Sequence, residues 1–236
     1  MPFTSRFPSR HRARRLSGRG VAAALATAAA ALTAAAVIPS AAADASVPAY
    51  RQQQGNDCEA SALRMVLAAR GRAVSDADVL GRIGVDLVHR RFGVSGPLSG
   101  DPYRAFVGSP DGSELAGSGY GVFAARVGDV AQSYGLRVLE AGEGIGVADL
   151  YRQVSAGHPA IVWVDYLWRQ MPQSYYTAYD GRRIPYEGPA EHTVVLVAVR
   201  GAEVRVNDPA RGVRWVAKSD FERGYHTYHD MAVIVS

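Results

Sequence analysis

The sequence contains very little cysteine: Cys58 is the only one among 236 residues. A single cysteine excludes an intramolecular disulfide, and the histidines show none of the Cys/His spacings of a structural zinc site. The sequence also lacks the glycine-rich signature of a nucleotide-binding phosphate loop. Nothing in it points to a metal or an organic cofactor. Cys58 is therefore an inert buried thiol, one half of an intermolecular bridge, or a nucleophile.

The body of the chain has no excess of positive charge, although the whole sequence carries a formal net charge of +4. Residues 1–43 hold six arginines and no acidic residue, so residues 44–236 contain 20 basic and 22 acidic residues. Proteins that bind nucleic acids present an excess of basic residues. The charge balance therefore predicts no nucleic-acid partner.

Long hydrophobic runs are absent apart from an alanine-rich stretch at residues 21–38. An arginine-rich start precedes this stretch, and Pro39 and the small residues 41–43 follow it, which is the pattern of a secretory signal with its cleavage site. The alternative is a transmembrane anchor, since the stretch is long enough to cross a bilayer. Its weak hydrophobicity and small-residue ending favour removal. We therefore predict a signal peptide over residues 1–43, a mature domain over residues 44–236, and a location outside the cell or at the exterior of the cell envelope, without membrane association after removal of the signal.

The order of the predicted elements indicates an α+β fold, with helices early in the chain and an antiparallel sheet at its end. Hydrophobic periodicity and capping residues predict helices at residues 60–70, 75–83, 122–134, 147–156 and 219–223. Apolar, β-branched runs predict strands at residues 136–140, 160–164, 193–199, 204–207, 213–217 and 231–235. Two long segments rich in polar, glycine or aromatic residues, 84–121 and 165–190, predict irregular loops that cover or line a site.

Cys58 lies at the predicted start of the first of these helices. The turn-like segment 55–57 precedes it, the apolar helical run at residues 60–70 follows, and Gly71 ends that run. The free N–H groups and the positive dipole end of a helix stabilise a thiolate over a thiol. A thiolate nucleophile also requires a general base and a group that stabilises an oxyanion.

Of the six histidines, His192 is the strongest candidate for the general base. It directly precedes the most apolar predicted strand, where a scaffold can present a polar side chain to a cleft. The alternative is a structural histidine at a strand end. Asp208 follows the next strand, sixteen residues after His192. Because a tight hairpin would bring the two strand ends together, Asp208 is predicted to orient the imidazole, as the carboxylate of a catalytic triad does.

The oxyanion stabiliser is expected to be a hydrogen-bond donor beside the thiolate, such as a glutamine amide together with the Cys58 backbone N–H. Gln52, Gln53 and Gln54 all precede Cys58. Composition and spacing do not choose among the three.

These residues together carry a family resemblance. Gln52 stands six residues before Cys58, a helix of small residues follows the Asp57-Cys58 pair, His192 opens an apolar strand, and Asn207-Asp208-Pro209 closes the next one. From about residue 48 to residue 235, the sequence resembles the peptidase C39-like branch of the papain-like cysteine peptidases. Glu59 stands where many members of that family carry glycine.

The resemblance implies a papain-like fold in which the helix bearing the cysteine packs on the antiparallel sheet bearing the histidine. It also implies the roles of oxyanion donor for Gln52, nucleophile for Cys58, base for His192 and orienting carboxylate for Asp208. The expected function is that of an exported cysteine peptidase or amidase acting on a peptide or amide substrate. Two alternatives stay open: a catalytically silent module that binds peptides or glycans, and an acyltransferase that passes the acyl group to an amine. The sequence specifies no oligomeric state.

Overall fold

A computed structural model of the protein describes residues 45–236. Fifteen helices and strands follow one another in these residues: α1 Cys58–Ala69, α2 Asp76–Ile83, β1 Val85–Asp86, β2 Phe106–Val107, α3 Ala124–Ser133, β3 Val138–Gly142, α4 Val147–Ser155, β4 Ala160–Asp165, β5 Tyr175–Thr177, β6 Arg183–Pro185, β7 Glu191–Arg200, β8 Glu203–Asp208, β9 Gly212–Ala217, α5 Lys218–Thr227 and β10 Ala232–Val235. The predicted mixture of helices and an antiparallel sheet is confirmed. The predicted signal peptide lies outside the described residues.

The main sheet has six strands in the order β3-β10-β4-β7-β8-β9, and every neighbouring pair is antiparallel. β7 and β8 form a hairpin closed by Gly201 and Ala202, where Gly201 adopts φ +53°, a conformation that glycine tolerates. This hairpin is the one that the sequence predicts, and its open end carries His192 and Asp208.

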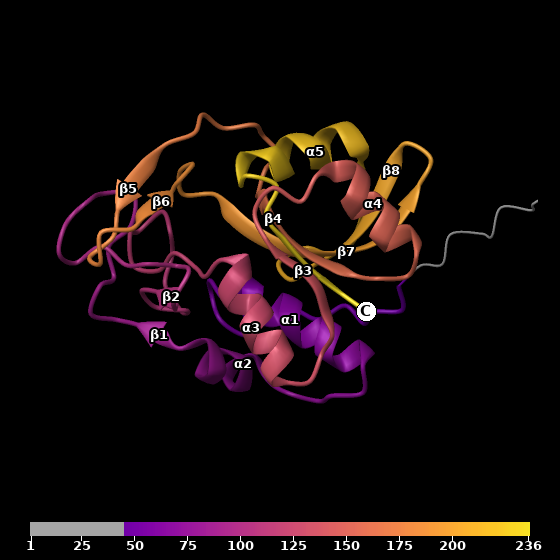
Figure 1. Ribbon diagram of the computed structural model, residues 1–236, viewed down its shortest axis with the longest axis horizontal. Helices are drawn as coiled ribbons and strands as arrows, with labels where there is room; N and C mark the ends of the chain where they lie inside the picture. Colours follow the sequence, from indigo (N-terminus) through magenta and orange to yellow (C-terminus); the bar gives the residue numbers. More distant parts are fainter. Residues whose placement is uncertain (1–44) are drawn as a thin grey trace, which may run out of the picture. The chain divides into compact units, whose positions relative to one another are not determined.

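Helices cover both faces of the sheet, with α1, α2 and α3 on one side and α4 and α5 on the other (Figure 1). Alternate residues of each central strand therefore enter different cores. In β4, Ile161 and Trp163 pack toward the α1 side, whereas Val162 and Val164 pack toward the α5 side. Because both faces are buried, the strand is continuously apolar instead of alternating with polar residues.

The structure differs from the prediction in three segments. The loop predicted at residues 165–190 contains the short hairpin of β5 and β6, and residues 84–121 contain the two-residue parallel pair of β1 and β2. The last helix, α5, extends well beyond the predicted range 219–223. Strand pairs as short as β1–β2 and β5–β6 have too few residues to show periodicity in the sequence, so their formation depends on contacts with other parts of the chain.

The core on the α1 side depends strongly on Trp163. Its side chain is fully buried in β4, and its indole N–H donates a hydrogen bond to the Val122 carbonyl at 3.1 Å. We expect Trp163→Ala to lower the free energy of unfolding by about 3–5 kcal/mol, because the cavity and the unpaired carbonyl add to the lost burial. Chemical denaturation measures this change. Trp215→Ala, on the exposed edge strand β9, is the control and should cost less than about 1 kcal/mol; equal losses for both variants would contradict the prediction.

In the described part of the chain, no helix has the length and apolar character needed to cross a membrane.

Candidate active site

Cys58 is the first residue of α1, as predicted, and its side chain is buried. The N–H groups in the first turn of a helix have no acceptor within the helix. Asp57, at the N-cap position, makes no side-chain capping bond to these groups and instead accepts from the Gln54 N–H at 3.1 Å. The side chain at the N-cap position therefore does not occupy the N–H groups of the first turn.

The loop that leads to Cys58 is anchored at both ends by distant parts of the chain. The Gln52 N–H donates to the carbonyl of Pro209, which directly follows the end of β8, at 3.2 Å. Gln53 exchanges two hydrogen bonds with Asp76 at the start of α2, at 2.9 and 3.1 Å. The Asn56 amide donates to the Tyr120 carbonyl at 2.9 Å. These bonds fix the approach to α1 against both the sheet and the neighbouring helix.

His192 and Asp208 lie side by side at the open end of the β7–β8 hairpin. Nε2 of His192 is 2.8 Å from Oδ1 of Asp208, and both residues are buried. The ring of Tyr166 packs edge-on against the imidazole, with ring centroids 5.0 Å apart. The predicted contact between the histidine and the carboxylate is therefore present in the structure, and it leaves Nδ1 of His192 as the ring nitrogen that can act on another group.

Asp208 is held in its ionised form by several donors. Its Oδ1 also accepts from the backbone N–H groups of Ala210 and Arg211, and its Oδ2 accepts from Nε of Arg211 at 2.7 Å. Burial would raise the pKa of Asp208, but the hydrogen bond and charge of His192 and the Arg211 guanidinium outweigh burial and hold the pKa well below its usual range. A carboxylate that stays ionised can stabilise a positive charge on His192.

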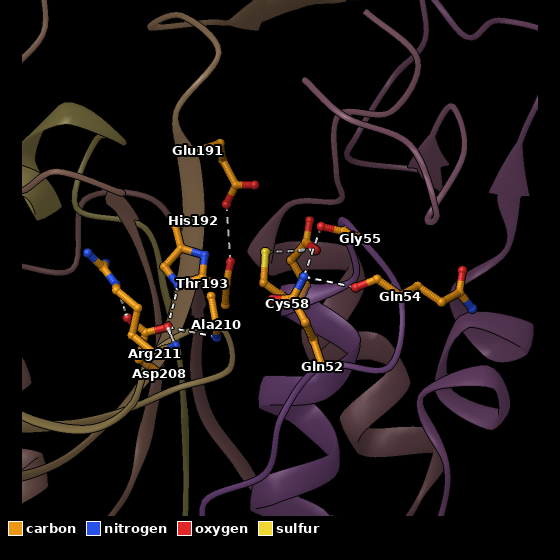
Figure 2. Close-up of polar contacts among 11 residues, drawn as sticks. Gln52, Gln54, Gly55, Cys58, Glu191, His192, Thr193, Asp208, Ala210 and Arg211 are labelled. Carbon is orange, nitrogen blue, oxygen red and sulfur yellow. Dashed lines mark hydrogen bonds and ion pairs between the residues drawn. The ribbon is translucent and has the colours of Figure 1, made fainter. Parts of the chain in front are cut away.

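Cys58 and His192 line the same cleft, which has a volume of about 580 Å³. Figure 2 shows the sulfur on the side of α1 that faces His192, with the ring nitrogen not bonded to Asp208 directed toward it. The structure thus brings together the candidate nucleophile and the candidate base, which are more than 130 residues apart in the sequence. The same cleft includes Gln52 and Ala210.

Among the described residues, Gln52 is the one of the three glutamines before Cys58 that lines the cleft. Its side-chain nitrogen lies beside Cys58 and donates to the carbonyls of Gln54 and Gly55, both at 3.0 Å (Figure 2). An amide nitrogen has two hydrogens, so both are engaged by the loop in this state. Oε1 of Gln52 is buried, without a hydrogen-bond partner among the described residues. The predicted oxyanion donor is thus near the sulfur but occupied.

The expected stabilisation of a thiolate at Cys58 by the helix start is wrong for this state. Burial raises the pKa of the Cys58 thiol well above its ordinary value, and the carboxyl groups of Glu59 and Glu191 raise it further. Of the groups that act on Cys58, only the Thr193 backbone N–H clearly lowers the pKa of the thiol. A helix end is equivalent to about half a charge, which is too little against burial and two nearby carboxylates. Cys58 is therefore a thiol at rest and needs a base to become a nucleophile.

Glu59 is the nearest of the groups that raise the pKa of the Cys58 thiol. Its Oε2 lies 3.4 Å from the Cys58 sulfur, and its Oε1 accepts from the Val122 N–H at 2.6 Å. Burial raises the pKa of Glu59 itself to about 7. Above neutral pH, its carboxylate therefore opposes loss of the thiol proton.

We expect Glu59→Gln to shift the alkylation of Cys58 by iodoacetamide to lower pH, because the amide removes the charge and still accepts from Val122. The measurement is the alkylation rate of folded protein between pH 5 and pH 10, followed by mass spectrometry. Glu203→Gln, at the exposed closed end of the β7–β8 hairpin, is the control. A profile for Glu59→Gln that overlays that of the wild type would contradict this account.

Several neighbours of the site were not identified from the sequence. Arg211 follows Asp208 by three residues, a spacing that suits an ion pair in a turn, and Glu191 directly precedes His192, so both had a local signal. Glu114 had none, because it lies in the irregular segment 84–121. Sγ of Cys58 and carboxyl oxygens of Glu59 and Glu191 lie within 4.8 Å of one another, close enough to share a metal ion.

Comparisons with known proteins agree with this architecture. The family model described as "Peptidase_C39 like family" matches residues 45–233. The uncharacterized protein YvpB of Bacillus subtilis (strain 168) is 27% identical over 187 residues, which cover 76% of this chain and 69% of that protein.

Two solved structures are also similar. A crystal structure from Bacillus anthracis, described as a candidate C39-like peptidase, superposes with a TM-score of 0.68 at 23% identity, over 81% of this chain and 94% of that one. A double glycine motif protease from an AMS/PCAT transporter, solved in complex with its leader peptide, gives a TM-score of 0.45 at 19% identity, over 81% and 91% of the two chains. The first of these supports the predicted C39-like fold.

Proposed function

Since the chain belongs to the Peptidase_C39 like family, we propose that it is a cysteine peptidase or amidase that cleaves a peptide or amide bond. The observation that carries this proposal is the shared cleft of Cys58 and His192, with His192 bonded to an ionised Asp208 at 2.8 Å. This set supplies a nucleophile, a base and a group that orients the base.

The reaction begins with proton transfer from the Cys58 thiol to Nδ1 of His192. The thiolate attacks the substrate carbonyl carbon, and the carbonyl π electrons move to oxygen as the S–C bond forms. His192 then donates its proton to the leaving amine as the C–N bond breaks. Water, deprotonated by His192, attacks the thioester, and the acid product leaves as the thiol is restored. Asp208 stabilises the imidazolium through Nε2 in both steps.

Two donors are positioned to stabilise the oxyanion. The Cys58 backbone N–H lies at the start of α1, where no intrahelical acceptor exists. The Gln52 amide lies beside it and would turn one hydrogen from a loop carbonyl to the oxyanion. Oxyanion donors typically contribute about 10²–10³ in rate.

A catalytically silent binding module is the second candidate function. The high thiol pKa favours it, because a protonated, buried sulfur is a poor nucleophile.

We also propose that residues 1–43 direct export and are then removed, which N-terminal sequencing of the protein recovered from culture medium would test.

A peptide-library experiment separates the two functions. Full-length protein is incubated with a mixed peptide library and with the same library plus a primary amine, and products are identified by mass spectrometry. New termini that carry free carboxylates support hydrolysis, and amide-linked adducts of the added amine indicate acyl transfer. Retention of library peptides without any cleavage would favour the binding module and overturn the enzyme proposal.

A further inference from the structure

Three glutamates line the candidate active-site cleft: Glu114, Glu187 and Glu191. Glu114 and Glu191 are each only 9% exposed, and Glu187 is 4% exposed. Glu187 has a side-chain partner, since its Oε1 lies 2.8 Å from Nε2 of His229. Burying a carboxyl group is costly unless it is paired. The cleft thus contains more buried acidic groups than its catalytic chemistry uses.

Within residues 45–236, Glu114 and Glu191 are hydrogen-bonded to each other, and neither forms a salt bridge with a basic side chain. Oε2 of Glu114 accepts the backbone N–H of Glu191 at 3.0 Å, and Oε1 of Glu191 accepts from the Thr193 hydroxyl at 3.1 Å. The nearby arginine of the cleft, Arg169, pairs with Asp165 instead. Burial raises the pKa of both glutamates well above its ordinary value, and the charge of Glu59 raises both further. No basic side chain of the described residues offsets these effects, so in this part of the chain the pair lacks a countercharge.

Two carboxyl oxygens of these glutamates lack a hydrogen-bond partner among the described residues. Oε1 of Glu114 is buried and has no hydrogen-bond partner among residues 45–236, and the same is true of Oε2 of Glu187. Buried polar atoms in folded proteins are nearly always paired, so each exception requires an explanation. Both oxygens belong to residues that line the cleft.

Glu114 and Glu187 come from the two long segments, 84–121 and 165–190, that the sequence predicts to cover or line a site, and Glu191 directly follows the second. Glu114 belongs to segment 84–121, whereas Glu187 and Glu191 belong to the connection between β6 and β7 and to the first residue of β7. Figure 2 shows Glu191 next to His192 on the same strand, with its side chain on the Cys58 side. A group bound by these carboxylates would therefore lie beside the reacting bond.

We propose that Glu114 and Glu191, with Glu187 in the same cleft, form an acidic subsite that binds a cationic group of the substrate, an ammonium or a guanidinium. The inference rests on the proposed peptidase function and adds the class of substrate. The cation would satisfy the unpartnered oxygen of Glu114 and supply the missing countercharge. It would also offset the carboxylates that disfavour the Cys58 thiolate, so binding and activation of the nucleophile would be coupled.

Binding of three small probes to the full-length Cys58→Ala protein tests the subsite without requiring turnover. The probes are lysine capped at both ends, norleucine amide with a free amino group, and norleucine capped at both ends, measured by isothermal titration calorimetry. The first carries a side-chain ammonium, the second a terminal ammonium, and the third no charge. At least one cationic probe should bind about tenfold tighter than the neutral probe, and comparison of the two identifies the source of the charge.

Substitutions locate the binding. Glu114→Gln should remove the preference for the cationic probe and leave binding of the neutral probe unchanged, and Glu191→Gln serves as the second variant if the first does not fold. Glu203→Gln is the matched control and should retain the preference. Equal binding of all probes, no binding of either cationic probe at millimolar concentration, or a preference that survives both cleft substitutions would overturn the proposal. Because the readout is binding, these outcomes are distinct from a failure of the library digestion.

Discussion

Cys58→Ala is expected to reduce hydrolysis of any peptide that the wild-type protein cleaves by about 10⁴-fold or more, which is the typical effect of removing a triad nucleophile. The sequence contains no second cysteine that could take over the role. The substitution removes one buried sulfur, so the fold should persist. The measurement is the initial rate of product formation on the best library peptide, with circular dichroism and the thermal midpoint as controls for folding.

Cys58→Ser sharpens this experiment. Serine retains a potential nucleophile of similar size, but a hydroxyl is much harder to deprotonate than a thiol, so the rate should be nearly as low as for alanine. If Cys58→Ala retains more than about a tenth of the wild-type rate while folded, the thiol is not the nucleophile and the enzyme proposal fails in its present form.

Asp208→Ala is expected to lower kcat by about 10³–10⁴-fold. Without the orienting carboxylate of a triad, the imidazole is no longer held in the tautomer that the reaction requires. In this protein we expect the substitution to reduce stability as well as kcat. The substitution would leave Nε2 of His192, the N–H of Ala210 and the guanidinium of Arg211 without their common acceptor. Stability should therefore fall together with activity, and kcat must be measured at a temperature where the variant is folded.

Asp208→Asn separates orientation from charge. The asparagine oxygen can still accept from Nε2 of His192 and from the two backbone N–H groups, while its NH₂ group would face Arg211 in place of an acceptor. Because the hydrogen bond to His192 is retained while the charge is lost, we expect kcat to fall by about tenfold to a hundredfold. Each tenfold step corresponds to about 1.4 kcal/mol. A loss as large as that of Asp208→Ala would show that the charge on Asp208, and not orientation, is the main contribution.

The ionisation of Asp208 also predicts how stability depends on pH. Its pKa in the folded protein lies below that of an unfolded chain, near 3.9, so its contribution to stability is complete above that value. The contribution is lost as the pH falls from about 4 toward the lower folded-state pKa. Denaturation of the wild type and of Asp208→Asn should therefore differ most above pH 4 and converge in stronger acid.

The sequence determined the local features of this protein. Helical spacing and the turn at residues 55–57 place Cys58 at the start of α1, and the apolar runs separated by Gly201 specify the hairpin that pairs His192 with Asp208. Both features depend on residues that are close in the sequence, where periodicity and turn residues act directly. The resemblance to C39-like peptidases rests on these same positions, and the family match extends over residues 45–233.

Only the tertiary structure decided the state of the thiol and the acidic character of the cleft. Glu191 lies close to the sulfur, and Glu114 contacts Glu191, only because α1, segment 84–121 and β7 pack together. The pKa of Cys58 depends on this burial and on these charges more than on its position at a helix start. Glu59 is adjacent to Cys58 in the sequence, but the burial of the sulfur and the approach of Glu191 arise from groups that meet across the fold, so local sequence could not reveal them.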